Sequence, residues 1–320
     1  LLTGRNPGKL EVGRPPRVVI LLATYNGAAF LSAQLRSFLA QTHSDWVLFW
    51  RDDGSADDTV AILEAFAAGE DRCVRVREPA GRLGATANFL ALLRTVHPTL
   101  GEGDVVAFAD QDDVWLPCKL ARGVAALAAA EPAVAALYCA RQVLVDAGLR
   151  RIGESPRLRR APAFPASLTQ NIAAGCTVML NRRAVALVAD SAPPAATFHD
   201  WWCYLVVTAS GGACLYDDAE VILYRQHGGN IVGVPPSMPR RALAAMRRGP
   251  AGFMDLLRAH VEALAARPEV LAGEARENVI RLREALGAGM GHRLVVLLTM
   301  RLRRATVLET ALFWLWFVNG

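Results

Sequence analysis

An apolar run that ends in a cluster of carboxylates constrains this chain more than any other feature. Residues 104–109 form a run typical of a strand buried within a sheet. Three of the next four residues, Asp110, Asp112 and Asp113, are acidic. Carboxylates this close repel one another unless a positive charge lies among them, and hard oxygen ligands suit Mg²⁺ or Mn²⁺. The run predicts either a divalent-cation site or a solvated acidic turn before a helix near Pro117.

The first half of the chain alternates apolar runs with amphipathic segments. Apolar runs over 17–23, 46–50, 73–77 and 104–109 predict strands, and apolar residues at helical spacing predict a helix after each of the first three. This alternation is typical of a doubly wound α/β sheet with right-handed crossovers. Three of the strands end in polar turns, at the edge where such sheets bind ligands. A dinucleotide site is disfavoured because no Gly-x-Gly-x-x-Gly follows the first strand.

The second half has a less regular pattern. We expect a strand or hairpin, a further strand, two helices and two short strands, over 133–145, 175–180, 182–188, 198–209, 213–216 and 220–224. Residues 150–165, rich in Arg and Pro, indicate an exposed loop. Helices with many arginines then follow to the end of the chain. We therefore divide the chain into a flexible leader over 1–16, an α/β domain over 17–233 and a helical region over 234–320.

The net charge limits the partners of the chain. With 35 basic and 30 acidic residues the formal charge is +5, and the pI is about 9.1. Such a balance suits anionic partners such as nucleotides, diphosphate lipids or the acidic face of a membrane. We expect no nucleic-acid partner, because the sequence has no nucleic-acid-binding motif. The six cysteines form no C-x-x-C pair and no stretch is long enough to span a membrane, which indicates a cytoplasmic protein with reduced thiols.

Seven polar motifs follow one another along residues 17–233. They are Ala-Thr-Tyr-Asn-Gly (23–27), Arg-Asp-Asp-Gly-Ser-Ala-Asp (51–57), Arg-Leu-Gly-Ala-Thr-Ala-Asn-Phe (82–89), Asp-Gln-Asp-Asp-Val-Trp (110–115), Asn-Ile-Ala-Ala-Gly-Cys-Thr (171–177), His-Asp-Trp-Trp (199–202) and Tyr-Arg-Gln-His-Gly-Gly-Asn (224–230). In that order the chain resembles the family 2 glycosyltransferases, inverting enzymes with the GT-A fold, a Rossmann-like doubly wound mixed sheet. The fourth, sixth and seventh motifs are similar to those of a rhamnosyltransferase-like branch.

The resemblance implies that the chain moves a sugar, with rhamnose as one candidate, from a dTDP- or UDP-linked donor to a glycan or lipid-linked acceptor. A divalent cation, Mg²⁺ or Mn²⁺, would stabilise the charge that develops on the diphosphate. By match to the family's Asp-x-Asp, Asp112 is the first metal ligand and Asp110 the second. His227 is expected to reach the metal or the diphosphate, and Arg225 the diphosphate. Asp113 is expected to face solvent or the sugar hydroxyls.

Donor recognition is expected at the turns after the first two strands. Asp53 matches the family aspartate that accepts a hydrogen bond from the pyrimidine N3–H, and a carboxylate, which only accepts, disfavours cytosine. The alternative for Asp53 is capping of the next helix. Arg82 is expected to pair with phosphate, or else to be a solvated loop arginine. The other residues expected to contact the nucleotide are Thr24, Tyr25, Asn26, Asn88, Asp110 and Gln111.

The acceptor side is expected around Asp200. In His-Asp-Trp-Trp, Asp200 matches the general base that takes the proton of the acceptor hydroxyl. Flanking tryptophans exclude water and raise the pKa of a carboxylate. The alternative makes Asp200 the N-cap of a helix whose tryptophans lie in the core. The residues expected near the sugar or the acceptor are Asp113, Trp115, Gly175, His199, Trp201 and Trp202, whereas Cys176 is expected to pack.

Two questions stay open at the end of the chain. Apolar blocks at 294–298 and 308–318 flank a basic block at 301–304. This pattern indicates either an interfacial helix, peripheral at the inner face of the cell membrane, or a helix packed on the domain or in a dimer. The second question is activity. The alternatives are a GT-A-like module that binds nucleotide or glycan without catalysis and, less favoured, a nucleotidyltransferase, which needs a Gly-rich phosphate loop after the first strand.

Overall fold

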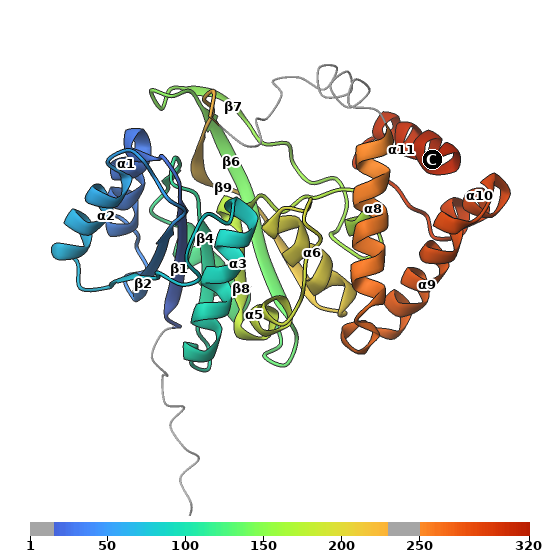
Figure 1. The fold of residues 1–320 in the computed structure, drawn as a ribbon, viewed down its shortest axis with the longest axis horizontal. Coiled ribbons are helices and arrows are strands. Elements are labelled where there is room, and N and C mark those ends of the chain that lie inside the picture. The colour runs from blue at the N-terminus through green and yellow to red at the C-terminus, as the bar shows by residue number, and fades with distance from the viewer. Residues whose placement is uncertain (1–15, 230–249) are drawn as a thin grey trace, which may run out of the picture.

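A mixed sheet forms the centre of the molecule (Figure 1). The computed structural model describes residues 16–229 and 250–320, so most of the predicted leader and the predicted boundary near residue 233 lie outside the described residues. Within that part the sheet has nine strands in the order β3-β2-β1-β4-β8-β6-β9-β5, with β7 paired to β6. The strands are β1 (Val18–Thr24), β2 (Trp46–Asp52), β3 (Cys73–Arg75), β4 (Val105–Ala109), β5 (Val114–Trp115), β6 (Ala136–Val145), β7 (Arg151–Glu154), β8 (Met179–Asn181) and β9 (Ala213–Arg225).

Side-chain alternation along β1 explains why helices cover both faces of the sheet. Val19 and Leu21 belong to one core, whereas Val18, Ile20 and Leu22 belong to another, and all five are at most 1% exposed. The first core is shared with α3 (Ala85–Val96), α5 (Arg182–Ala189) and α6 (His199–Ala209). The second is shared with α1 (Ala28–Leu39), α2 (Thr59–Ala68) and α4 (Lys119–Ala128). The predicted doubly wound α/β fold is thereby confirmed.

The parallel strands β1, β2 and β4 bring three polar turns to one edge of the sheet. Thr24 lies opposite Asp52 in the β1–β2 pair, and Leu22 lies opposite Ala109 in the β1–β4 pair. The segments that follow these strands therefore begin side by side at the carboxyl edge.

Three elements of the second half differ from the predictions. Residues 175–180, predicted as one strand, form a 3₁₀ turn (Gly175–Thr177) followed by β8. The predicted loop over 150–165 contains β7. The last two predicted strands are one strand, β9, which pairs in parallel with β6. The register shifts on either side of Arg141, so Asp218 has no partner in the ladder, and this polar bulge made one strand look like two.

Four α-helices complete the described chain: α8 (Pro250–Ala265), α9 (Gly273–Gly287), α10 (Met290–Thr299) and α11 (Val307–Asn319). Helix α8 belongs to the same core as α6. His260 Nε2 hydrogen-bonds Thr197 Oγ1 at 2.7 Å, and its ring lies 5.0 Å from that of Trp201, so α8 supports the segment that leads into α6. Among the described residues, no helix combines the length and apolar character that crossing a membrane requires.

Candidate active site

Gln111 joins the turn after β1 to the turn after β4. Its side-chain amide pairs with the backbone of Tyr25 in both directions: Tyr25 N donates to Gln111 Oε1 at 2.9 Å, and Gln111 Nε2 donates to Tyr25 O at 2.9 Å. This close approach depends on Gly27, where a Cβ atom would lie 2.3 Å from Gln111 Oε1. Gln111, predicted to contact the nucleotide, therefore uses its amide to hold the two turns together.

Asp200 lies near the acidic cluster, because Gly175 N donates to its carboxylate and the next residue, Cys176, has its sulfur within 4.8 Å of ligand atoms of Asp110 and Asp113. Burial, together with the neighbouring charges of Asp112 and Asp200, raises the pKa of Asp110 to about 8. Asp200 comes from α6, far along the chain from β4, so the fold brings the two together. The predicted base therefore lies near the predicted metal ligand Asp110.

Backbone N–H groups hold the Asp200 carboxylate in the first turn of α6. Gly175 N donates to Oδ2 at 2.9 Å and Trp201 N donates to Oδ1 at 2.6 Å. Burial nevertheless raises the pKa of Asp200 to about 6. The N-cap alternative fails, because Phe198 occupies that position. Gly175, predicted near the acceptor, instead positions Asp200: a Cβ atom there would lie 2.9 Å from His199 Nε2.

Asp112 and His227 are adjacent, although 115 positions separate them in the chain. His227 Nε2 lies 2.8 Å from Asp112 Oδ2, and both side chains keep some exposure, 19% and 17%. Carboxylate and imidazole groups both bind Mn²⁺, and carboxylates bind Mg²⁺. The Asp112 charge also acts on Asp110. Asp112 and His227 are therefore the pair of ligand-type groups available to a divalent cation, whereas the ligand atoms of Asp110 group with those of Asp113 and Cys176.

Arg225 braces the acidic turn from β9. Its backbone N–H donates to Asp113 Oδ1 at 3.1 Å, and its Nε donates to the Asp112 carbonyl at 2.7 Å. The side chain is buried, with the guanidinium 4.5 Å from the centroid of the Phe30 ring. Arg225 therefore supports the acidic turn, and its contact with the diphosphate stays a prediction.

Two residues predicted to face the sugar or solvent are buried. Asp113 has no exposed surface, and burial together with its carboxylate neighbours raises its pKa well above the ordinary value. Trp115 is 2% exposed and packs edge-on against Phe38, with ring centroids 4.7 Å apart. Asp113 therefore does not face solvent. The pairing of β5 with β9, which starts at the residue after Asp113, takes Trp115 into the sheet.

Lys119 belongs to this pocket and was missed by sequence reasoning. Its side chain is fully buried, and its Nζ has no hydrogen-bond partner among the described residues and lies 3.6 Å from the centroid of the Trp115 ring. Burial lowers the pKa of Lys119 to about 7, while Cys176, Asp113 and Asp110 act in the opposite sense. The available signal was compositional: the chain has 33 arginines and only two lysines.

A second cluster of ligand-type atoms suits a cation less well. Ligand atoms of Asp110, Asp113 and Cys176 lie within 4.8 Å of one another. Burial raises the pKa of the Cys176 thiol well above its ordinary value, so the thiolate that a metal needs is disfavoured. The ammonium of Lys119 already supplies positive charge there. Cys176 packs as predicted, with Gln142 Nε2 donating to its sulfur at 3.3 Å.

On the donor side, Asp53 is buried, and its carboxylate accepts hydrogen bonds from one side chain and from the backbone. Its Oδ1 accepts from Arg51 at 2.9 Å and from Leu83 N at 2.7 Å, and its Oδ2 accepts from Gly84 N at 2.7 Å. Oδ2 keeps acceptor capacity for one further donor. Asn88 is buried, and the Arg51 guanidinium donates to its Oδ1 at 3.0 Å; contact of Asn88 with the nucleotide stays a prediction.

The turn after β1 carries one exposed aromatic ring, that of Tyr25. Thr24 Oγ1 donates to Asp52 Oδ1 at 3.0 Å, and Asn26 Oδ1 accepts from the backbone at 2.8 Å, so both side chains shape the turn. Tyr25, by contrast, is 37% exposed, and the Arg82 guanidinium lies 4.1 Å from the centroid of its ring. This stacked pair offers an aromatic face and a positive charge beside the pocket.

Only one of the three aromatic residues of His-Asp-Trp-Trp keeps surface beside Asp200. Trp202 is 2% exposed, and its Nε1 donates to Ser191 Oγ at 2.7 Å. His199 stacks on Phe89 with ring centroids 4.1 Å apart, and burial lowers its pKa to about 3. Both were predicted near the acceptor and belong to the core instead. Trp201 is partly exposed, with its Nε1 donating to Ser167 O at 2.8 Å.

Two hollows formed by the described residues lie away from this edge. One is lined by residues of α8 and α9, including Ala265 and Val279, and the other by residues near the start of β6, including Ala135 and Gly212. Neither includes a predicted site residue.

Comparison with known proteins places the chain in a family. Residues 19–187, more than half of the chain, match the family model Glycosyl transferase family 2. A dTDP-rhamnosyl transferase of Shigella flexneri is 26% identical over 225 residues, which cover 66% of this chain and 73% of that protein. A UDP-Glc:alpha-D-GlcNAc-diphosphoundecaprenol beta-1,3-glucosyltransferase of Escherichia coli is 30% identical over 103 residues, which cover 32% of this chain and 38% of that protein.

Solved structures share the fold. TarS of S. aureus in complex with UDP-GlcNAc has a TM-score of 0.56 at 13% identity, with 94% of this chain and 89% of that chain covered. The mannosyltransferase PcManGT of Pyrobaculum calidifontis in complex with GDP-Man and Mn²⁺ has a TM-score of 0.50 at 19% identity, with 98% and 89% covered. With the family model matching over half of its length, the chain belongs to glycosyl transferase family 2, enzymes that transfer a sugar from a nucleotide sugar.

Proposed function

We propose that the chain transfers its sugar in one inverting displacement, with Asp200 as the general base. The observation that carries this proposal is the position of Asp200 beside the acidic cluster: Gly175 N donates to its carboxylate, and the adjacent Cys176 lies against Asp110 and Asp113. The acceptor hydroxyl gives its proton to the Asp200 carboxylate while its oxygen bonds to the anomeric carbon. The bond from that carbon to the diphosphate breaks, and its electron pair leaves with the diphosphate. A pKa of about 6 leaves Asp200 mostly ionised at pH 7.

The donor is proposed to be a pyrimidine nucleoside diphosphate sugar bound on the Tyr25 side of the pocket. The Arg82–Tyr25 pair offers a face for the base and a charge for phosphate. Oδ2 of Asp53 retains acceptor capacity for a base N–H. The similarity to a protein named dTDP-rhamnosyl transferase supports rhamnose as the sugar and dTDP as its carrier.

A divalent cation is proposed at Asp112 and His227, with Asp110 beside them. When bound, Mg²⁺ or Mn²⁺ would neutralise charge on the leaving diphosphate. The 2.8 Å separation of Asp112 Oδ2 and His227 Nε2 supports the assignment, because both groups point at one place. The Mn²⁺ in the mannosyltransferase of the same fold is in keeping with it.

The acceptor is proposed to be a lipid-linked saccharide, reached from the cytoplasmic face of a membrane. The E. coli relative, by its name, acts on a sugar attached to diphosphoundecaprenol. Trp201, the residue after Asp200, is partly exposed and is proposed to offer a stacking surface for the acceptor sugar.

The variant Asp200→Asn tests the proposed base. The amide keeps the size of the carboxylate but takes up no proton, so transfer should fall by about a thousandfold. Donor affinity, measured by calorimetry with dTDP-rhamnose and UDP-sugars in Mn²⁺, should change little. The exposed Asp190, changed to Asn, is the matched control and should behave as wild type. Near-normal transfer by a folded Asp200→Asn enzyme would refute the assignment.

A further inference from the structure

We infer that the corner between α10 and α11 is a docking surface for an anionic lipid bilayer. This corner, residues 298–308, presents large apolar side chains to solvent: Leu298 is 56% exposed, Val307 84% and Leu308 64%. The exposed stripe continues along α10 with Leu294 and Val295, at 46% and 56%. Apolar side chains this exposed, gathered at one corner, indicate a surface that is covered when the protein works.

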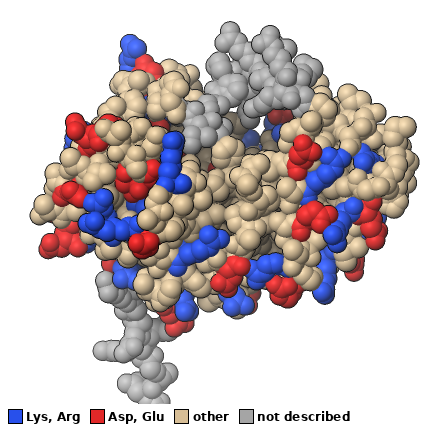
Figure 2. Space-filling model, viewed as in Figure 1, with Lys and Arg blue, Asp and Glu red and all other residues tan. Residues whose placement is uncertain are grey.

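The charges at the corner are all of one sign. Residues 285–308 contain four arginines and neither Asp nor Glu. The side chains of Arg301 and Arg303 are exposed between the apolar ends of the two helices. Glu309, the first acidic residue beyond this stretch, is engaged in capping α11 through Thr306. In Figure 2 the right-hand end of the molecule, where α10 lies, is mostly free of charged side chains, unlike the surface of α9 below it.

A segment from the sheet adds to the same positive surface. We name residues 155–170 the strap; it has three arginines and no acidic residue. Its far end contacts the corner: Arg160 donates to Arg304 O at 3.3 Å, Thr169 Oγ1 donates to Arg303 O at 2.8 Å, and Gln170 accepts from Ala305 N at 2.8 Å. In Figure 1 the strap runs from β7 toward the C-terminal helices.

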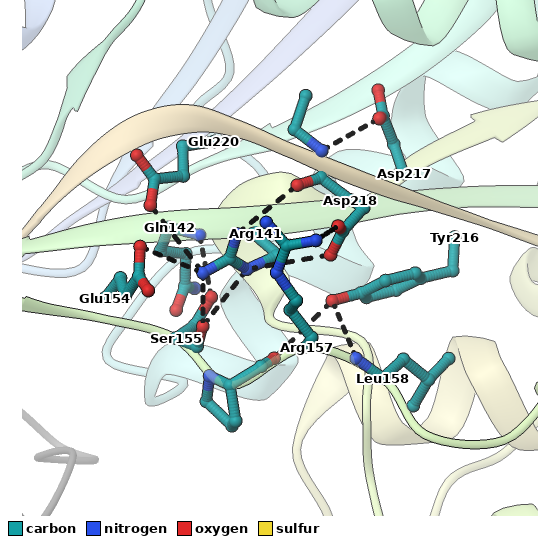
Figure 3. Close-up of polar contacts among 12 residues, drawn as sticks. Arg141, Gln142, Glu154, Ser155, Arg157, Leu158, Tyr216, Asp217, Asp218 and Glu220 are labelled. Atoms are coloured by element: carbon teal, nitrogen blue, oxygen red, sulfur yellow. Dashed lines mark hydrogen bonds and ion pairs between the residues drawn. The ribbon is translucent and has the colours of Figure 1, made fainter.

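Its near end is anchored on the sheet, as Figure 3 shows. Arg141 donates to Ser155 O at 3.0 Å, Arg157 forms an ion pair with Asp218, and Tyr216 Oη accepts from Leu158 N at 3.2 Å. The strap is therefore fixed at both ends, and the corner has a constant place relative to β6 and β9.

This chemistry selects a bilayer rather than a protein partner. Interfacial helices combine Leu, Val, Trp or Phe with arginines, and anionic headgroups attract each arginine while the apolar side chains enter the acyl boundary. A second copy of the chain would have to cover the exposed arginines with acidic groups, and this surface carries none to offer in a symmetric contact. The observations thus fit a cytoplasmic leaflet rich in anionic lipid.

The strap also connects the surface to the reaction. Asn171 follows the strap directly, and its side chain hydrogen-bonds Asp200. A bilayer at the corner would thus lie a short way along the chain from the base. This part of the inference rests on the proposed function, because it names the surface from which a lipid-linked acceptor is reached.

Vesicle binding tests the inference. The full-length chain should sediment with vesicles of phosphatidylcholine and phosphatidylglycerol in equal amounts, less with phosphatidylcholine alone, and less as salt is raised. Arg301→Gln with Arg303→Gln should weaken binding by about fivefold for each arginine. Val307→Ser with Leu308→Ser should weaken it by roughly tenfold. Ile152→Ser on β7, 59% exposed, and Arg150→Gln, whose side chain is 88% exposed, are the matched controls and should bind as wild type.

The outcomes separate this inference from the proposed activity. Hydrolysis of the nucleotide sugar in solution needs no bilayer, so it should be unchanged in all four variants and reports the proposed function independently. Failure to bind anionic vesicles, or equal binding by the corner variants and the controls, would overturn the inference. So would a concentration-dependent dimer in solution that the Val307→Ser, Leu308→Ser variant dissolves, because a second copy would then be the occupant.

Discussion

The two sides of the active site are built differently. On the donor side, the carboxylates of Asp52 and Asp53 accept hydrogen bonds from backbone N–H groups and, for Asp53, from Arg51. On the other side, Asp113 Oδ2 and Lys119 Nζ are buried without a hydrogen-bond partner among the described residues. The donor-side carboxylates therefore have hydrogen-bond partners within the protein. On the other side, two buried polar atoms lack such partners among the described residues.

This difference indicates where the chemistry belongs. Burial raises the pKa of Asp110 to about 8 and of Asp200 to about 6, and it lowers the pKa of Lys119 to about 7. Perturbed pKa values of this kind gather where proteins hold reacting or ligand-binding groups. A bound diphosphate, cation or acceptor would supply interactions that the carboxylate pocket lacks, whereas the donor turns need none to keep their shape.

The largest effect beyond loss of the base is expected from Lys119→Met. The lowered pKa of Lys119 means that folding disfavours its protonated amine, so an apolar side chain of similar volume should raise the free energy of unfolding at pH 7 by about 1–4 kcal/mol. Urea unfolding at pH 7 measures it. Arg122→Met is the control, one turn later on α4, because its side chain is 45% exposed and losing its ion pair with Asp217 should lower stability by about 1 kcal/mol. A loss of stability in both variants would remove the contrast between these buried groups and the surface.

A smaller effect is expected from Gly27→Ala in the donor turn. The new Cβ atom would lie 2.3 Å from Gln111 Oε1, so the link between the β1 and β4 turns must open, at roughly 1–3 kcal/mol of stability. Thermal or urea unfolding measures the loss, and Gln111→Ala in the same chain should recover part of it. Gly69→Ala, where the nearest atom to a Cβ lies at 3.8 Å, is the control. No difference between the two alanines would mean that the donor turn is less rigid than its hydrogen bonds indicate.

The pH dependence of transfer follows from Asp200. A general base must be ionised, and burial places its pKa at about 6, so the rate should be level above that pH and fall about tenfold per unit below it. Initial rates from pH 4.5 to 8 at saturating donor measure the profile. Donor binding should change less over this range, because the donor turn is held mainly by backbone hydrogen bonds. If the transfer rate instead began to fall only near pH 4, the pKa of Asp200 would be that of a solvated carboxylate.

The sequence predicted the donor half of the fold well, for a physical reason. Each of its strands is a continuous apolar run, and each polar turn follows directly, so periodicity alone locates them. Strand β9 was predicted as two strands because the acidic residues of its bulge, 217–220, interrupt the apolar pattern. The 3₁₀ turn at Gly175 was not predicted, because an apolar run of that length also fits a strand.

The carboxylate side was harder to predict. Adjacent aspartates look alike in sequence, and which one turns inward depends on β5 pairing with β9, a long-range contact that sequence reasoning did not foresee. Asp113 was therefore expected to face solvent. Lys119, at the start of a helix, looked like an ordinary surface residue, and only the scarcity of lysine in the chain set it apart.

The smallest effect is expected from Arg82→Ala. The guanidinium lies over the exposed Tyr25 ring, and such a contact is worth about 0.5–1 kcal/mol, so donor affinity should fall roughly two- to fivefold without loss of stability. Calorimetry with the donor and Mn²⁺ measures it, and Arg77→Ala, exposed in the same loop, is the control. A loss of about a hundredfold would instead mean that Arg82 forms a paired contact with the diphosphate. Arg82, on the donor side, would then gain its ion pair only when the donor binds. The two sides would in that case differ only in their buried residues.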